Sequence, residues 1–330
     1  MHLGIEIGGT KLQIGVGDGK SSRLEAWERF DIQPQRGAAG ILEQIENSSA
    51  SWKQRYSLNG VGVGFGGPVD TAAGRTVKSH QIEGWEGIAL GRWCEELFEA
   101  PAALVNDCDA AALAEALYGA GRTCRSVFYV TVGTGVGGGF VLDGRLHGEG
   151  RPAASEIGHL RPGLHAERPE ETVESLASGW GLAAAASQRL QGEATRPLQL
   201  DSRQKQQVEQ EYREDLLSRS QGDENQLTAK ILAQAAEEGN EIALQVIHNG
   251  TQALGWAIAQ VITLLAPEKV VVGGGVSLMG EALFLQPLRR HTAHYVFPPL
   301  AGSCSIESAE LGELVVVCGA IASSRQTTRA

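Results

Sequence analysis

Two patterns of apolar and polar positions alternate along this chain. Short apolar runs end at glycines, as in LGIEIGG from Leu3, and between them lie stretches with the apolar spacing of helices. We expect strands at 61–70, 102–105 and 269–276, helices at 38–52, 90–99, 109–119, 182–220 and 241–265, and a final apolar run that ends near Ala322. Strands that alternate with helices predict an α/β fold.

An internal repeat relates two of the strand segments. IEIGGTKLQIGVGDG from Ile5 matches VTVGTGVGGGFVLDG from Val130 at a constant offset of 125 residues, so that Gly8 meets Gly133. Each copy has a strand, a glycine-rich turn, a returning strand and an Asp-Gly pair typical of hairpins. Unless this short match is coincidental, it predicts two similar half-folds, each with a turn of bare backbone N–H groups.

Composition narrows the class of protein. The 43 glycines cluster after apolar strands, which suggests backbone brought close to a ligand. A net charge of -11 argues against nucleic acid as a partner. We see no apolar run of membrane-spanning length and no signal peptide, so we expect a cytoplasmic protein that does not bind membranes. The five cysteines form no CxxC pair, which favours reduced thiols over disulfides or a thiolate zinc site.

Three glycine-rich turns follow apolar strands, at 8–11, 133–135 and 273–275. Successive N–H groups at glycines, aided by a hydroxyl and an ammonium, can bind phosphate, so a nucleotide is the leading ligand class. A single turn of this kind is more often an ordinary hairpin. A P-loop or Rossmann motif is disfavoured, because a strand and not a helix follows the first two turns.

Several polar residues stand where a ligand could use them. Glu6 lies within an apolar strand and needs a partner, since an unpaired buried charge costs at least about 2–7 kcal/mol. Asp107, beside Asn106, follows the strand AALV, where it could accept a proton or cap a helix. Glu156 and His159 share one side of a turn, as a ligand pair or as a structural pair.

Ordered motifs along nearly the whole chain resemble the ROK family (repressors, open reading frames and sugar kinases) of the actin-like ATPase superfamily. The motifs are IGGTK at 7–11, GGPVD at 66–70, EGW at 83–85, ND at 106–107, GTGVGGG at 133–139, EIGH at 156–159, ESLASG at 174–179 and VVGGGV at 271–276. The resemblance implies a two-lobed, ribonuclease H-like α/β fold with nucleotide and sugar in a cleft between the lobes. We expect a small lobe formed by 1–119 plus about 306–330, and a larger lobe formed by 120–305.

The resemblance also implies roles for individual residues. Asp107 matches the general base, and ATP with Mg²⁺, near Glu6, would supply the phosphoryl group. The residues that match sugar ligands are Gly67, Gln81, Asn106, Asp107, Glu156, His159 and Glu174. The residues that match the nucleotide site are Glu6, Gly8, Gly9, Thr10, Lys11, Gly133, Thr134, Gly135, Gly274 and Gly275.

The chain departs from the family pattern at three places. The cysteine-rich zinc loop that often follows GH is missing, so we expect no structural zinc, and His159 needs another partner; His165 and Glu167 could serve, although both fit simple loop residues. Gln81 stands where the family often has Asn, and one further methylene could change hydroxyl recognition. Glu6 stands where the family more often has Asp.

These features predict an ATP-dependent hexose kinase that transfers the γ-phosphoryl group to a sugar hydroxyl, with the 6-OH of glucose as the leading acceptor. Fructose, mannose or an amino sugar are alternative acceptors. A non-catalytic sugar sensor or regulator is the second hypothesis. DNA binding is disfavoured because no helix-turn-helix precedes the strand at Leu3. A homodimer is expected from the resemblance alone.

Overall fold

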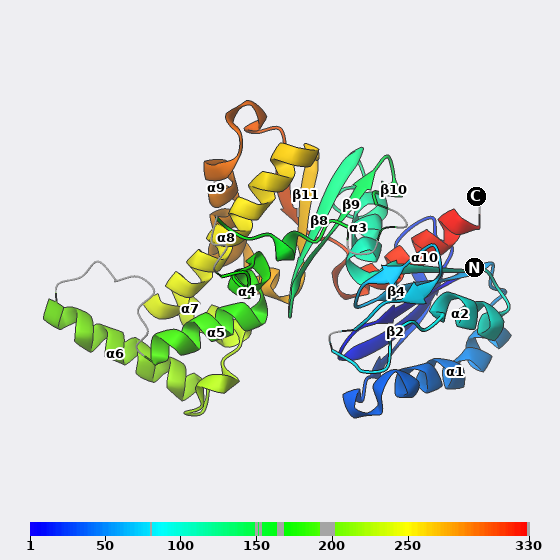
Figure 1. Ribbon diagram of the computed structural model, residues 1–330, viewed down its shortest axis with the longest axis horizontal. Coiled ribbons are helices and arrows are strands. Elements are labelled where there is room, and N and C mark those ends of the chain that lie inside the picture. Colours follow the sequence, from blue (N-terminus) through cyan, green and yellow to red (C-terminus); the bar gives the residue numbers. More distant parts are fainter. Residues whose placement is uncertain (80, 149–150, 152–153, 164–167, 192–201, 329–330) are drawn as a thin grey trace. The chain divides into compact units, whose positions relative to one another are not determined.

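The computed structural model describes residues 1–79, 81–148, 151, 154–163, 168–191 and 202–328 (Figure 1). The chain divides into two compact units. The first unit comprises Met1–Val130, Gly138–Ser155 and Ala309–Ala330, and the second comprises Thr131–Gly137 and Glu156–Ser308. Within the described part, no helix has the length and apolar character needed to cross a membrane. The lobe boundaries expected from the resemblance stay a prediction.

The first unit is built on a five-stranded sheet in the order β3-β2-β1-β4-β7. β1 is antiparallel to β2 and parallel to β4, and β4 is parallel to β7. Helices α1 and α2 lie on one face of this sheet, where large buried side chains, Trp52 and Trp85 among them, form a cluster. The strands are β1 His2–Ile7, β2 Lys11–Gly17, β3 Leu24–Asp31, β4 Gly60–Phe65 and β7 Ala102–Asn106, with the two-residue strands β5 Val69–Asp70 and β6 Arg75–Thr76 outside the sheet. The helices of this unit are α1 Gly37–Arg55, α2 Leu90–Phe98, α3 Asp107–Tyr118 and α10 Val315–Thr327.

The other face of the sheet is covered by α10, which also packs on α3 (Figure 1). Glycines make this packing close. A Cβ atom at Gly62 would lie 1.8 Å from the carbonyl oxygen of Ala320, and one at Gly319 would lie 1.7 Å from that of Ala110. Part of the abundance of glycine therefore serves helix packing, which the interpretation from composition alone did not include.

A second five-stranded sheet has the order β10-β9-β8-β11-β12. Its strands β8 and β9 each contain residues of both units. β11 and β12 are parallel, and β9 and β10 are antiparallel. The strands are β8 Ser126–Val132, β9 Val136–Leu142, β10 Arg145–Leu146, β11 Lys269–Gly273 and β12 Ser305–Ser308.

The predicted repeat is confirmed as two hairpins. In the first, the N–H of Gly8 donates to the carbonyl of Lys11 at 3.0 Å, and in the second, the N–H of Gly133 donates to the carbonyl of Gly135 at 2.9 Å. Asp143 and Gly144 form the next turn with φ values of 50° and 74°. The Asp-Gly pair thus has the left-handed conformation that two-residue hairpin turns require.

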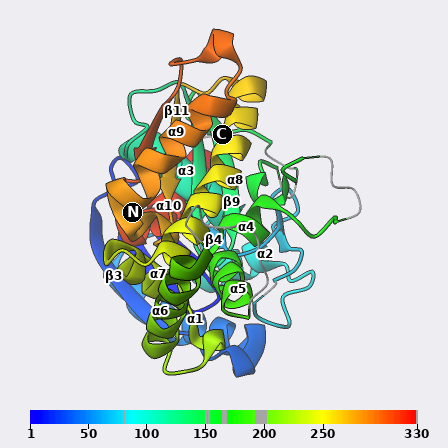
Figure 2. The same cartoon turned by 90° about the vertical axis from the view of Figure 1, so that its left-hand side faces the viewer.

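The helices of the second unit gather around the long helix α8, Glu241–Leu265, which packs against α4, α5, α7 and α9 (Figure 2). The single helix expected over 182–220 is instead two helices, α5 and α6, and residues 192–201 between them lie outside the described part. The other helices of this unit are α4 Val173–Ala177, α5 Gly179–Leu190, α6 Ser202–Arg219, α7 Ala229–Glu237 and α9 Gln286–Tyr295.

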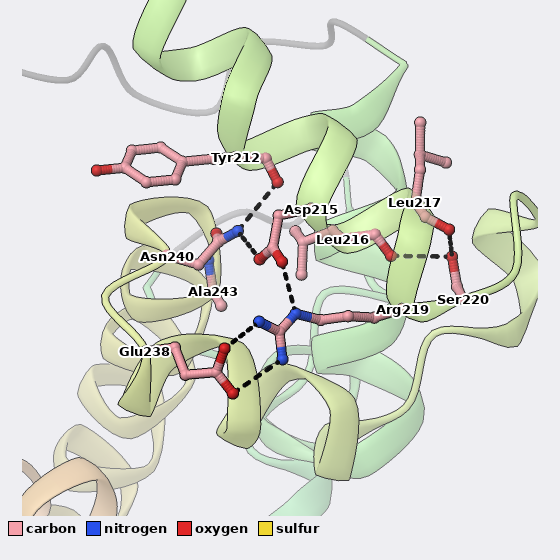
Figure 3. Close-up of polar contacts among 9 residues, drawn as sticks. All are labelled: Tyr212, Asp215, Leu216, Leu217, Arg219, Ser220, Glu238, Asn240 and Ala243. Atoms are coloured by element: carbon pink, nitrogen blue, oxygen red, sulfur yellow. Dashed lines mark hydrogen bonds and ion pairs between the residues drawn. The ribbon is translucent and has the colours of Figure 1, made fainter.

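Charged and amide side chains join α6 to the segment between α7 and α8 (Figure 3). The guanidinium of Arg219 donates to Asp215 at 2.8 Å and to Glu238 at 2.5 Å, and these hydrogen bonds raise the pKa of Arg219. Asn240 caps α8 through Ala243 and donates to Asp215 at 2.8 Å. Charged residues near the end of α6 therefore anchor that helix to the rest of the second unit.

Candidate active site

The buried acid Glu6 has a definite partner in the structure. Its Oε1 lies 3.3 Å from the ammonium nitrogen of Lys11, at the other end of the first glycine-rich turn. Burial raises the pKa of Glu6 to about 7 although Lys11 lowers it, and the acids Asp107 and Glu313 raise it further. The Oε2 of Glu6 has no hydrogen-bond partner among the described residues.

Lys11 also contacts residues that the sequence interpretation did not include. Its ammonium donates to the Oε1 of Gln13 at 2.7 Å and to the carbonyl of Glu313 at 3.4 Å. The Oε1 of Glu313 lies 3.5 Å away and also accepts from Arg29 at 2.6 Å. Glu313 lies in a short 3-10 helix, Gly312–Leu314, and follows Lys11 by 302 residues. No local sequence pattern could therefore have identified it.

The first turn itself is open to solvent. Thr10 is exposed, and Gly8 and Gly9 are half-buried. Gln81 covers Gly9 so closely that a Cβ atom there would lie 1.4 Å from the Oε1 of Gln81. The structure therefore brings one predicted sugar ligand, Gln81, against the predicted phosphate turn.

Asn106 and Asp107 lie where β7 passes into α3. Asn106 is the N-cap of α3: its Oδ1 accepts from the N–H of Cys108 at 2.8 Å, and its Nδ2 donates to the carbonyl of Gly67 at 3.0 Å. The capping interpretation is thus correct for Asn106. Asn106 also fixes the backbone at Gly67, another predicted sugar ligand. Gly67, Asn106 and Asp107 therefore form one group.

Asp107 is the first residue of α3, and the helix dipole stabilises a negatively charged carboxylate at this position. Its Oδ1 accepts from the N–H of Cys108 at 2.9 Å. A Cβ atom at Gly66 would lie 3.5 Å from its Oδ2, and glycine leaves that space open. Burial raises the pKa of Asp107, against the hydrogen bonds from Cys108 and Asn106 that lower it. An acid with a raised pKa can serve as a general base.

In the second unit, Glu174 binds the second glycine-rich turn. Its Oε2 accepts from the N–H of Val136 at 2.9 Å, and a Cβ atom at Gly135 would lie 2.6 Å from the same oxygen. Glu174 lies on α4, whose N-terminus is closed by a capping box between Thr172 and Ser175. Thr134 at the tip of the turn is exposed.

Backbone from two more segments meets this turn. The N–H of Gly179, the first residue of α5, donates to the carbonyl of Gly133 at 2.8 Å. Gly274 has a φ of 89°, and a Cβ atom there would lie 2.5 Å from the carbonyl oxygen of Val132. The N–H of Gly275 lies 3.9 Å from where a Cβ of Gly133 would be. The structure therefore brings 133–135, 179 and 274–275 together, and Gly179 is a member that the sequence interpretation missed.

Glu156 is the N-cap of a single 3-10 turn, Ile157–His159, and His159 is its last residue. The N–H of His159 donates to the carbonyl of Glu156 at 3.1 Å, and the His159 side chain is exposed. His165 and Glu167, the suggested partners of His159, lie outside the described residues. A search of the described residues finds no cluster of three or more acids, histidines and cysteines that could hold a metal ion.

An unpaired carboxylate oxygen beside the first turn fits the binding of a magnesium nucleotide. Glu6 Oε2 is a buried acceptor without a hydrogen-bond donor among the described atoms, which is what a carboxylate awaiting a metal-bound water would show. The Lys11 ammonium, the N–H group of Gly9 and the Thr10 hydroxyl are donors of the kind that phosphates accept.

Comparisons with known proteins identify the family of this chain. A model of the ROK family matches residues 2–327, and the chain belongs to this family. A glucokinase of Halalkalibacterium halodurans is 30% identical over 329 residues, which cover 96% of this chain and 93% of the relative. A ROK family glucokinase of Streptomyces griseus, solved in complex with glucose and AMPPNP, has 27% identity and a TM-score of 0.78, covering 98% of this chain and 99% of that one.

The family also contains regulators. A xylose repressor of Caldicellulosiruptor bescii is 27% identical over 283 residues, which cover 86% of this chain and 66% of the repressor. The structural match to the sugar kinases confirms the predicted α/β class and the actin-like ATPase fold.

Proposed function

We propose that this protein is an ATP-dependent hexose kinase and that the 6-OH of glucose is its preferred acceptor. The observation that carries the proposal is Asp107, a half-buried acid with a raised pKa at the N-terminus of α3, within a family whose solved members include a glucokinase with bound glucose and AMPPNP. Glucose is the first choice because the glucokinase of H. halodurans matches nearly the whole chain.

In this proposal Asp107 accepts the proton of the attacking sugar hydroxyl. Asn106 holds the backbone of Gly67, so that both residues present fixed hydrogen-bonding groups to the sugar. Glu156, His159 and Glu174 bind further hydroxyls, and Gln81 contributes from the segment that covers Gly9. Buried sugar hydroxyls need such partners because each unpaired group lowers affinity.

The two glycine-rich turns and Gly274-Gly275 bind the nucleotide in the same proposal. Lys11 and Thr10 would donate to phosphate oxygens, and Glu6 would help to hold the magnesium ion. When bound, MgATP supplies the γ-phosphoryl group and the positive charge that offsets its oxygens. The protein's share of the rate enhancement is positioning and charge stabilisation.

The decisive test is Asp107→Asn. We expect ADP release in the presence of sugar to fall by about 100-fold or more, as for loss of a general base. Sugar affinity, measured by calorimetry, should change far less, because the amide retains the size of the carboxyl group. An Asp107→Asn variant that turns over at the wild-type rate would refute the role of Asp107.

A coupled assay of ADP release over glucose, fructose, mannose and amino sugars tests the acceptor. We expect the highest kcat/KM with glucose. Gln81→Asn, which shortens the side chain by one methylene, should change the ranking of sugars more than it changes KM for ATP. A ranking led by another hexose would replace glucose and leave the kinase assignment in place.

A sugar-binding regulator is the second candidate, and the match to the xylose repressor favours it. Sugar binding by calorimetry without ADP formation over the whole panel would support this candidate against the kinase. For either function we propose a cytoplasmic homodimer. Light scattering of the purified protein would test the dimer, and cell fractionation would test the location.

A further inference from the structure

The ammonium of Lys11 is surrounded by acceptors from three separate segments of the first unit. They are the Oε1 of Gln13 at 2.7 Å, the Oε1 of Glu6 at 3.3 Å, and the carbonyl and carboxylate oxygens of Glu313 at 3.4 and 3.5 Å. An ammonium has three donors, so these oxygens saturate it. The long and flexible lysine side chain is therefore held in one place by the protein alone.

Gln13 makes the shortest of these contacts and is completely buried. It lies directly opposite Glu6 in the β1–β2 register, so both side chains project from the same face of the sheet. Its Nε2 has no hydrogen-bond partner among the described residues, and neither does the Oε2 of Glu6. A buried amide with an unpaired N–H group lowers stability, and an apolar side chain at this position would avoid that loss.

Fold stability alone therefore does not explain Gln13. Its pairing with Lys11 does, because the Oε1 of Gln13 is a neutral acceptor. It fixes the ammonium without adding a negative charge beside Glu6 and Glu313, which already face Lys11. Glu313 is held in turn by Arg29 at 2.6 Å, so the charged contacts extend from the turn to β3.

We propose that Gln13 is a positioning residue for the phosphate turn and that it holds the Lys11 ammonium in place before the nucleotide binds. This inference rests on the proposed function. The side chain of Lys11 loses its conformational entropy during folding. Less entropy is therefore lost when a phosphate binds. Glu313 supports the same lysine from the segment before α10.

The first test measures the contact without reference to any activity. Competitive reductive methylation with quantification by mass spectrometry reports how accessible the Lys11 amine is. We expect labelling of Lys11 to increase several-fold in Gln13→Leu. Gln44→Leu is the matched control, because Gln44 on α1 donates only to the carbonyl of Asp31 in the described structure and does not contact Lys11. Unchanged labelling of Lys11 in Gln13→Leu would overturn the proposal.

The second test measures the consequence for the nucleotide. Calorimetry with ADP, with and without Mg²⁺, should show a Kd about five- to tenfold higher in Gln13→Leu, the scale of one side chain that must be ordered on binding. KM for ATP should rise by a similar factor, and KM for the sugar should stay unchanged. The thermal midpoint should stay unchanged or rise. Gln13→Glu, which keeps an acceptor oxygen, should restore slow labelling of Lys11.

The outcomes separate the inference from the proposed function. Faster labelling with a wild-type Kd for ADP would show that the contact does not serve the nucleotide, and so would a loss confined to the sugar. A lower thermal midpoint with unchanged ADP binding would assign Gln13 to the fold. A wild-type protein that binds no ADP would refute the kinase and the role of Gln13 together, while the labelling would still report whether Gln13 holds Lys11.

Discussion

The two glycine-rich hairpins share a backbone plan and differ in how they are held. In the first, charged and amide side chains surround the turn, and the pairs Glu6–Lys11 and Lys11–Gln13 make the contacts. At the equivalent positions, 125 residues later, the second hairpin has Thr131, Val136 and Gly138. There the contacts are mainly made by backbone groups, with one carboxylate from Glu174.

This difference separates two requirements of a turn that is proposed to bind phosphate. The first hairpin provides charge, and a charged group in a buried strand must be paired or its pKa shifts, as that of Glu6 does. What matters in the second hairpin is the backbone conformation of the turn, which depends on close contacts between backbone segments. We therefore expect substitutions in the two hairpins to fail in different ways.

The largest effect should come from Gly274→Ala beside the second hairpin. Its φ of 89° disfavours alanine, and the new Cβ would overlap the carbonyl oxygen of Val132 at 2.5 Å. We expect a loss of about 4 kcal/mol in the free energy of unfolding, from strain and overpacking together. Urea titration followed by circular dichroism would measure it.

Gly275→Ala is the matched control for stability. A Cβ there meets nothing within 4 Å and its φ is not in the left-handed region. Its free energy of unfolding should stay within about 1 kcal/mol of the wild type. Equal losses in the two variants would show that the shape of this turn does not depend on backbone contact.

The next effect is a pH dependence confined to the first hairpin. Burial raises the folded-state pKa of Glu6 from 4.5 to about 7, so its favourable contribution is complete below about pH 4.5 and is lost as the pH rises through about 7. Lys11, Asp107 and Glu313 are the charged groups that act on it. Between these pH values the stability of the wild type should fall by about 3 kcal/mol relative to Glu6→Gln.

Urea unfolding of both proteins at a series of pH values isolates this contribution, because the other titrating groups cancel in the difference. Thr131, the counterpart of Glu6, does not titrate, so Thr131→Val should keep the slope of the wild type. A Glu6→Gln profile parallel to that of the wild type would mean that Glu6 is already compensated in the folded state.

The smallest effect should come from Glu174→Gln. The amide can still accept from the N–H of Val136, but it lacks the charge that strengthens this hydrogen bond. We expect a loss of about 1 kcal/mol in the free energy of unfolding. Glu170→Gln is the control, because its side chain is exposed; a comparable loss in both variants would contradict a specific role of Glu174 in the turn.

Much of the fold could be predicted from the sequence where local patterns determine it. The helix expected at 241–265 coincides with α8, Glu241–Leu265, because Asn240 caps it and an apolar face continues through it. The helix expected at 109–119 begins two residues earlier, at Asp107, because the cap is Asn106. The repeat was visible because glycines mark both turns. The sequence interpretation did not include β3, α7 and α9, although half-buried and exposed residues alternate along the whole of β3.

For the site, the sequence predicted residue types and not their contacts. It identified Glu6 as a charge in need of a partner, and the structure supplies Lys11, five residues on. Gln13 and Glu313 were missed because their importance lies in contacts to Lys11 that only a folded strand pair and a distant segment create. The roles of the predicted sugar and nucleotide ligands stay predictions for the experiments above.

The close fit of α10 to glycines on the first sheet has a consequence for the order of synthesis. Residues 315–327 follow the whole of 156–308, so a ribosome makes the second unit before the covering helix of the first. Domains generally fold from the N-terminus during synthesis at about 5–20 residues per second. One face of the first sheet therefore waits on the order of ten seconds for the helix that covers it.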